Sequence, residues 1–107
     1  LALRHLRHPF LTNLLSDGDP RVVIAAGRAI HDAPVVAGMP GLASLLTRID
    51  CPPALLSRSI DAAFRLGTAQ HAQTLASLAK RRDPSPQIRA FALRAAVPFA
   101  RASGVKF

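Results

Sequence analysis

The architecture of the whole chain follows from one segment, Pro53-Ala-Leu-Leu-Ser-Arg-Ser-Ile-Asp-Ala-Ala-Phe-Arg-Leu-Gly67. Proline suits the first turn of a helix and glycine suits the left-handed residue just past its end, so the segment predicts one complete helix. Two apolar flanks run along this helix, and a narrow polar stripe separates them. One flank holds Leu56, Ile60, Ala63 and Phe64, the other holds Leu55, Ala62 and Leu66, and the stripe holds Arg58, Asp61 and Arg65. A helix covered on two sides belongs in the middle of a stack of helices.

Composition places the chain among all-α domains. Half of its 107 residues are apolar, and most of these are Leu, Ala, Val and Ile, with no Trp or Tyr. Abundant Ala and Leu favour helices over strands. The length suits a single domain spanning residues 1–107. No apolar run approaches the ~20 residues that a membrane span needs, so we expect no membrane insertion. The chain starts at Leu1 with no signal-peptide pattern, and we expect it to be a fragment of a larger protein.

The charge and the cysteine count narrow the possible partners and chemistry. The net charge is +8, from fourteen Lys and Arg against six acidic residues. Such an excess biases non-specific contacts toward anionic partners. Cys51 is the single cysteine, which excludes an internal disulfide and a Cys-x-x-Cys redox or zinc pair.

Cap and breaker residues predict the other helices. Asp19 is a good N-cap ahead of Pro20, Thr68 is a plausible cap, and Asp83 repeats the arrangement of a cap followed by proline. Pro98 is expected to end or kink the last helix. The expected helices cover about Leu1–His8, Pro9–Leu15, Pro20–His31, Pro40–Ile49, Ala69–Arg81 and Pro86–Val97.

The longer helices recur at a constant spacing. Their starts at Pro20, Pro53 and Pro86 are each thirty-three residues apart, with shorter Leu/Ala-rich helices between them. A helix–turn–helix unit at such a period is typical of an α-solenoid. A compact helical bundle would explain the apolar spacing but not the repeated starts. We therefore predict an α-solenoid of about three helical hairpins.

Two groups of residues resemble known repeats. Asp19-Pro20-x-Val22 with its following alanines and Ile30, and also Ile88-Arg89-x-x-Ala92-Leu93, look like HEAT-type repeats. More narrowly, Gly27-Arg-Ala-Ile-His-Asp32 together with the run from Arg58 to Gly67 is similar to the helical region of certain exported bacterial multidomain proteins. Those proteins carry a β-propeller dehydrogenase-like part of the glucose/sorbosone type, then HEAT-like repeats, then a c-type cytochrome domain.

The resemblance implies a role without chemistry for this chain. The haem motif Cys-x-x-Cys-His is missing, since Cys51 is followed by two prolines, and the propeller strands are missing as well. The family tends to have acids at the positions of Ala25 and Phe91, Asn at that of Asp61, and a Trp near Pro98. The resemblance therefore implies a non-catalytic scaffold, exported or periplasmic, that spaces or docks the flanking domains of its parent protein or another protein.

Charged residues on the helices form a candidate structural ladder. At i, i+3 and i, i+4 spacing such groups pair along one helix, and in a stack they can bridge neighbouring repeats. We interpret this ladder as support between repeats and not as a ligand site. Its members are Arg28, Asp32, Arg58, Asp61, Arg65 and Arg89.

Catalytic, metal and cofactor sites are not expected. The four histidines, His5, His8, His31 and His71, have no cysteine near them and no third ligand beside the His5/His8 pair, whereas a structural zinc takes about four ligands. Acid–base or nucleophilic catalysis needs a positioned pair of groups, and the acids here fall at helix caps or on polar stripes.

A basic surface that binds nucleic acid is the alternative function. It would use Arg4, Arg7, Lys80, Arg81 and Arg82. Phosphate contacts of this kind weaken steeply with salt. Against it, the five Phe fall mostly on apolar faces and offer few stacking surfaces. The end repeats of a solenoid expose apolar flanks, so weak self-association is a further hypothesis.

Overall fold

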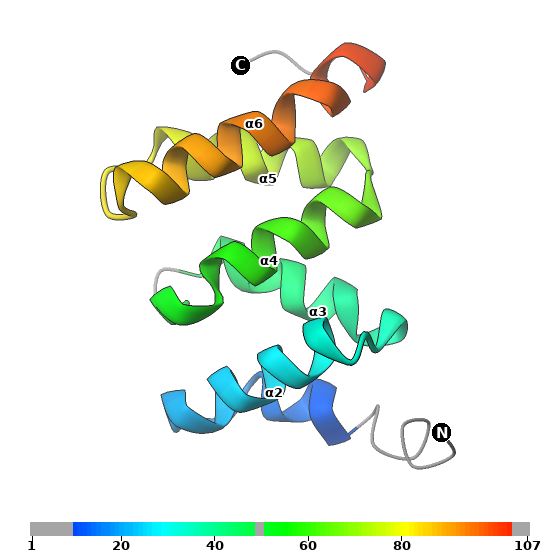
Figure 1. Cartoon of the computed structure of the whole chain (residues 1–107), viewed down its shortest axis with the longest axis vertical. Coiled ribbons are helices and arrows are strands. Elements are labelled where there is room, and N and C mark those ends of the chain that lie inside the picture. The colour runs from blue at the N-terminus through cyan, green and yellow to red at the C-terminus, as the bar shows by residue number, and fades with distance from the viewer. Residues whose placement is uncertain (1–9, 49–50, 104–107) are drawn as a thin grey trace.

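The computed structural model describes residues 10–48 and 51–103, the last five by their backbone alone, and every regular element in these ranges is helical (Figure 1). The predicted all-α class is therefore confirmed. Residues 10–14 form a short helical segment. The α-helices are α2 (Pro20–Asp32), α3 (Met39–Ser44), α4 (Pro53–Leu66), α5 (Ala69–Lys80) and α6 (Pro86–Ser103), and η1 (Val36–Gly38) and η2 (Leu45–Thr47) are single turns of 3₁₀ helix.

Local sequence sets where the longer helices begin and end. The helices α2, α4 and α6 begin at Pro20, Pro53 and Pro86, as predicted. The side chain of Asp19 caps α2 by accepting the backbone N–H of Arg21 at 2.9 Å. Gly67 ends α4 in the left-handed region, with φ 64°, which glycine adopts without steric cost. Thr68 caps α5 as predicted, because its hydroxyl accepts the N–H of His71 at 3.2 Å.

The helices form two layers along an axis 41 Å long (Figure 1). One layer holds α2, α4 and α6, and α4 contacts both of its neighbours in that layer. The shorter helices α3 and α5 lie behind, each packed against the longer helix that follows it in the chain. Because α4 contacts α2, α3, α5 and α6, its predicted central position is confirmed.

The buried side of α4 differs from the predicted one. Leu55 and Ile60 are fully buried, but Phe64, expected on an apolar face, is 41% exposed. Ser59, which belonged to neither flank, is fully buried. The difference arises because α4 touches α2 and α6 on opposite sides, which rotates the buried arc toward Ser59. The spacing of residues along one helix cannot predict where the neighbouring helices lie.

Three boundaries also differ from the expected ones. The helix expected over Pro40–Ile49 ends at Ser44 and tightens into η2, while Ile49 lies outside the described residues. Ser85, rather than Asp83, caps α6 by accepting the N–H of Ile88 at 3.3 Å. Pro98 lies inside α6, which continues to Ser103. A proline removes one helical hydrogen bond, and here that loss does not end the helix.

Ser59 is a weak point of the core, and replacing it with alanine is expected to stabilise the protein. Its hydroxyl is buried and has no hydrogen-bond partner among the described residues. Ala26 and Ala92 stand thirty-three residues to either side, and both are buried. Ser59→Ala should raise the free energy of unfolding by about 1 kcal/mol, since an unsatisfied buried hydroxyl is removed and alanine favours the helix. Urea denaturation followed by circular dichroism measures this change, and a destabilised variant would contradict it.

Candidate functional site on the α2, α4 and α6 layer

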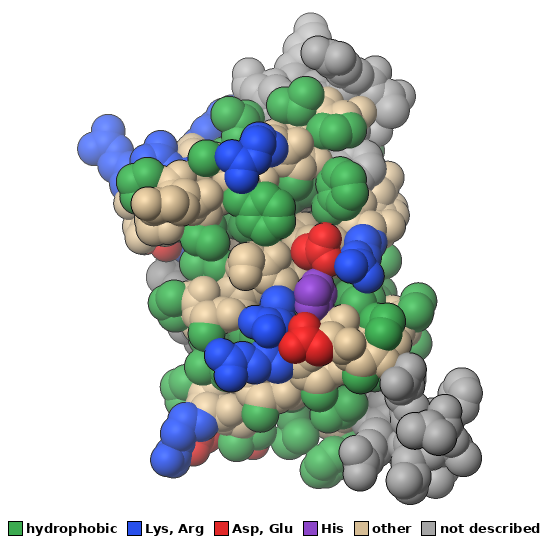
Figure 2. Space-filling model, in the orientation of Figure 1, with side chains coloured by type: hydrophobic (Ala, Val, Ile, Leu, Met, Phe, Trp, Pro, Cys, Tyr) green, Lys and Arg blue, Asp and Glu red, His purple; other side chains and the backbone are tan. Residues whose placement is uncertain are grey.

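Five side chains form a continuous charged chain across α2 and α4. The ring of His31 lies between two carboxylates, with Nδ1 2.8 Å from Asp32 Oδ1 and Nε2 2.7 Å from Asp61 Oδ2. Arg58 donates to both oxygens of Asp32, each at 3.1 Å. Arg65 Nε lies 2.9 Å from Asp61 Oδ2. Figure 2 shows acidic, histidine and arginine side chains gathered on this face. We call Arg58, Asp32, His31, Asp61 and Arg65 the charged chain.

The charged chain joins α2 to α4. Both ring nitrogens of His31 face carboxylate oxygens, one on its own helix and one on α4. A carboxylate only accepts hydrogen bonds, so His31 bonds to Asp32 and Asp61 at the same time only when both of its ring nitrogens donate. Two of these contacts, Asp32 with Arg58 and His31 with Asp61, connect α2 to α4. The arrangement can therefore hold the two helices in register.

The sequence reasoning missed His31 as a member of the charged chain. It identified the other four residues, but it placed His31 only among possible metal ligands. Asp32 pairs with Arg58 of the next long helix and not with Arg28 of its own helix. A bidentate guanidinium–carboxylate pair is stronger than a single contact along one helix. No local spacing signals this pair, because twenty-six residues separate its members.

Asp32 has a strongly lowered pKa. The hydrogen bonds from Arg58, and then the contact with His31, lower the pKa of its carboxyl group from 3.8 to about 2. Each stabilises the ionised form directly. The unfolded chain lacks these partners, so the Asp32 carboxyl group binds a proton more readily when the protein unfolds.

Acid is expected to remove the contribution of Asp32 to stability. That contribution is complete above the ordinary pKa of 3.8 and is lost as the pH falls from 3.8 through about 2. The difference in urea midpoint between the wild type and Asp32→Asn should therefore be present at pH 5.5 and shrink by pH 2.5. Asp19 and Asp83 also have lowered pKa values, but they titrate equally in both proteins. A midpoint difference that stays constant with pH would contradict this expectation.

The remaining ladder candidates lie apart from the charged chain. Arg28 is exposed on α2, and no ion pair involves it within the described residues. Arg89 lies on α6, where its Nε donates to the backbone carbonyl of Ala79 at 3.1 Å and so satisfies a carbonyl at the end of α5. The six predicted residues are therefore not one ladder: four belong to the charged chain, one caps a neighbouring helix and one points outward.

Two arginines each connect to a backbone carbonyl of an earlier helical segment. Arg48 Nη1 donates to the carbonyl of Leu15 at 3.2 Å, and Arg81 Nη1 donates to the carbonyl of Leu46 at 3.3 Å. Leu15 directly follows the helical segment of residues 10–14, and Leu46 lies in η2. Arg48 and Arg81 are thirty-three residues apart, the same spacing as the helix-starting prolines. That spacing is a sequence signal for these contacts, whereas the basic run Lys80 to Arg82 by itself predicts only a charged surface.

The predicted basic surface is only partly available. Arg81 is held by the Leu46 carbonyl and by both carboxylate oxygens of Asp83, which neutralises its charge. Lys80 and Arg82 are exposed. The other two members, Arg4 and Arg7, lie outside the described residues.

A small apolar groove adjoins the charged chain between α4 and α6. Phe64, Phe91 and Ala95 line it, with Asp61 and Arg94 at its edge. It encloses about 280 Å³, at the lower limit of the roughly 300–1,000 Å³ typical of small-molecule sites. Phe64 and Phe91 stand thirty-three residues after His31 and Arg58, so an aromatic pair occupies here the positions that the charged chain occupies between α2 and α4.

Neither a metal centre nor a membrane helix is found in the part of the chain that the structure describes. Among the described residues, no three His, Cys, Asp or Glu side chains are grouped so as to hold a metal ion. None of the described helices combines the length and the apolar character needed to cross a bilayer.

Comparisons of the chain with known protein families, with curated proteins and with solved structures found no match.

Proposed function

We propose that the chain is a HEAT-like α-solenoid of about three helical hairpins. In this arrangement α3 pairs with α4 and α5 pairs with α6. Residues 10–14, which line one groove together with α2, form the first hairpin with it. The constant spacing of the prolines that begin α2, α4 and α6 supports it, as do the contacts between successive long helices within one layer. One helical hairpin cannot bury both of its faces alone, and stacking at a constant period is the solenoid solution.

The proposed role is a non-catalytic scaffold that docks a neighbouring protein domain. By the resemblance stated above, those domains are the flanking ones of an exported bacterial dehydrogenase–cytochrome c protein, and the module itself carries no cofactor. The observation that supports docking is the groove of Phe64 and Phe91 beside the charged chain. An aromatic pair that is exposed at Phe64 and half-buried at Phe91 suits a partner that inserts an apolar side chain within a polar rim. Arg94 and Asp61 supply the charged part of that rim.

The charged chain serves this role by fixing the surface. The contacts of His31 and Arg58 hold α2 against α4, and α4 carries one wall of the groove. Arg89 holds the end of α5 against α6, which carries the other wall. In this proposal the charged residues position the docking surface and do not themselves react.

Titration of the isotope-labelled chain with each separately produced flanking domain tests the proposal by nuclear magnetic resonance. The complete reading frame supplies these domains, and we expect a propeller before this segment and a Cys-x-x-Cys-His motif after it. Chemical-shift changes should concentrate at Phe64, Phe91 and Arg94. Phe91→Ala should weaken binding at least tenfold, whereas Gln73→Ala, on the exposed side of α5, should not. A reading frame without such domains, or shift changes elsewhere, would overturn the proposal.

A further inference from the structure

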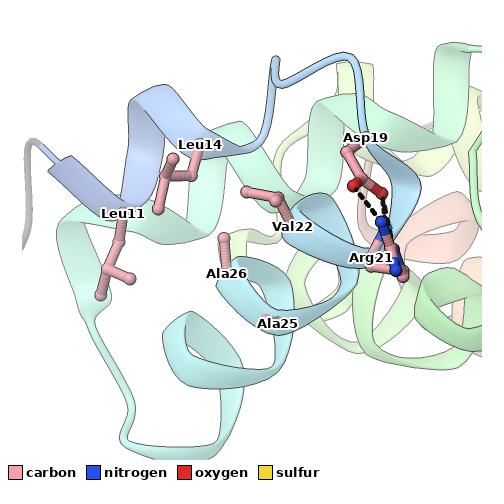
Figure 3. Close-up of a pocket in the computed structure, with 7 residues that line it drawn as sticks. All are labelled: Leu11, Leu14, Asp19, Arg21, Val22, Ala25 and Ala26. Atoms are coloured by element: carbon pink, nitrogen blue, oxygen red, sulfur yellow. Dashed lines mark hydrogen bonds and ion pairs between the residues drawn. The ribbon is translucent and has the colours of Figure 1, made fainter.

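The outer side of α2 carries an apolar groove at the N-terminal end of the row of helices (Figure 3). Leu11 and Leu14 line it from the segment of residues 10–14, and Val22, Ala25 and Ala26 line it from α2. Asp19 and Arg21, paired with each other, stand at its edge: Asp19 Oδ2 lies 2.9 Å from Arg21 Nη2.

The internal repeat identifies what this groove is built to contact. Val22 stands thirty-three residues before Leu55, so the two occupy equivalent positions on α2 and α4. The side chain of Leu55 packs directly over Gly27 of α2, leaving no room for a β-carbon there. Val22, on the open side of α2, is thus the counterpart of Leu55, the residue through which α4 packs on α2.

The other end of the row presents the complementary surface. Leu93 on α6 stands in the position of Gly27 on α2, sixty-six residues later. It is 47% exposed, with exposed Ala90 and half-buried Val97 one turn to either side. These three residues, which we call the α6 stripe, are the counterparts of the α2 surface that receives α4. The two ends of the chain therefore display the sequence positions that form its internal α2–α4 contact, with Val22 in place of Leu55 and Leu93 in place of Gly27.

We propose that a second copy of the chain docks head to tail, with the α6 stripe of one copy packed into the α2 groove of the next. Val22 of one copy then lies on Leu93 of the other, as Leu55 lies on Gly27 within the chain. The contact joins two different surfaces, so each new copy leaves one groove and one stripe open. The assembly grows as a row and does not stop at a closed dimer. This inference does not rest on the proposed docking of flanking domains.

Hydrogen bonding at the two ends is compatible with this contact. Within the chain, Arg81 of a following hairpin satisfies the carbonyl of Leu46. The equivalent carbonyl at the far end, that of Ala79, is satisfied by Arg89 of its own hairpin. In a docking copy the position equivalent to Arg48 and Arg81 is Leu15, thirty-three residues before Arg48. A leucine cannot donate a hydrogen bond to the Ala79 carbonyl of the preceding copy. Since the Ala79 carbonyl already has its donor, this leucine leaves no acceptor unsatisfied.

Light scattering and sedimentation of the whole chain over a hundredfold range of concentration test the proposal. The average molar mass of the wild type should rise with concentration beyond the mass of a dimer and should not reach a plateau. Association should strengthen between 50 and 300 mM salt, because the +8 charge on each copy opposes it. Ala25→Glu blocks the groove and Leu93→Glu blocks the α6 stripe, and each alone should weaken association at least tenfold. Both substitutions lower the net positive charge, so repulsion cannot explain such a loss.

Mixing the two variants gives the decisive result. Each retains the surface that the other lacks, so an equimolar mixture should form one-to-one dimers that grow no further. Val36→Glu changes a side chain that is 76% exposed outside both surfaces, and it should associate like the wild type. Circular dichroism checks that every variant is folded. A monomer at all concentrations, or loss of association in only one of the two blocking variants, would overturn the proposal.

Discussion

Replacement of Leu55 by alanine is expected to lower the free energy of unfolding by about 2–5 kcal/mol. The side chain is fully buried where α4 packs on α2, directly over Gly27. Because glycine has no side chain to move into the space, the cavity left by the substitution is filled poorly. We therefore expect a loss in the upper half of that range.

Urea denaturation followed by circular dichroism at 222 nm measures this loss, since the chain has no Trp or Tyr for fluorescence. Val36→Ala, at an exposed position, is the matched control and should change stability by less than about 0.5 kcal/mol. A loss of under about 1 kcal/mol for Leu55→Ala would mean that α2 and α4 are not packed as described.

Replacement of Gly27 by valine is expected to have the second largest effect. A β-carbon at this position would lie 2.7 Å from both terminal methyl groups of Leu55, and Leu55 is enclosed on all sides. Overpacking of this kind costs about 1–3 kcal/mol. The gain in helix propensity over glycine is only a few tenths of a kcal/mol and does not offset it.

Combination of the two substitutions separates packing from propensity. In the Leu55→Ala background the space over residue 27 is empty, so Gly27→Val should cost nothing or should stabilise. The coupling energy between the two sites should reach about 1–3 kcal/mol. Additive effects would show that the cost of valine arises within α2 and not at its contact with α4.

Much of the helical framework could be predicted because its signals act over a few residues. Proline at the first helical position, the Asp19 and Thr68 caps, and Gly67 in the left-handed region each fix a helix end through local geometry. The constant spacing then relates one long helix to the next. Rotation of each helix about its axis could not be predicted, because it depends on where the neighbours lie. Ser59 and Phe64 exchanged their expected environments for that reason.

The candidate site was predicted only in part. Spacing along single helices identified Asp61 with Arg65, which do pair at i, i+4. It missed the position of His31 between two carboxylates, because one of those carboxylates belongs to another helix. It also assigned Arg81 to a surface, although Asp83 and a backbone carbonyl hold it. Ion pairs and hydrogen bonds between helices depend on how the helices stack, and no pattern within one helix predicts that.

The contact of α4 with α2 combines the apolar packing of Leu55 with polar contacts at its edge, whereas the contact of α4 with α6 has aromatic residues at that edge. The two contacts should therefore respond differently to pH and salt. The ion pair of Asp32 with Arg58 and the hydrogen bond of His31 with Asp61 bridge α2 and α4. Phe64 and Phe91 occupy the equivalent positions between α4 and α6. Low pH and high salt weaken the polar contacts between α2 and α4, and they leave the aromatic contact between α4 and α6 almost unchanged. Under such conditions α2 should open first and exchange its amide protons soonest, while α4 to α6 persist as a smaller cooperative unit.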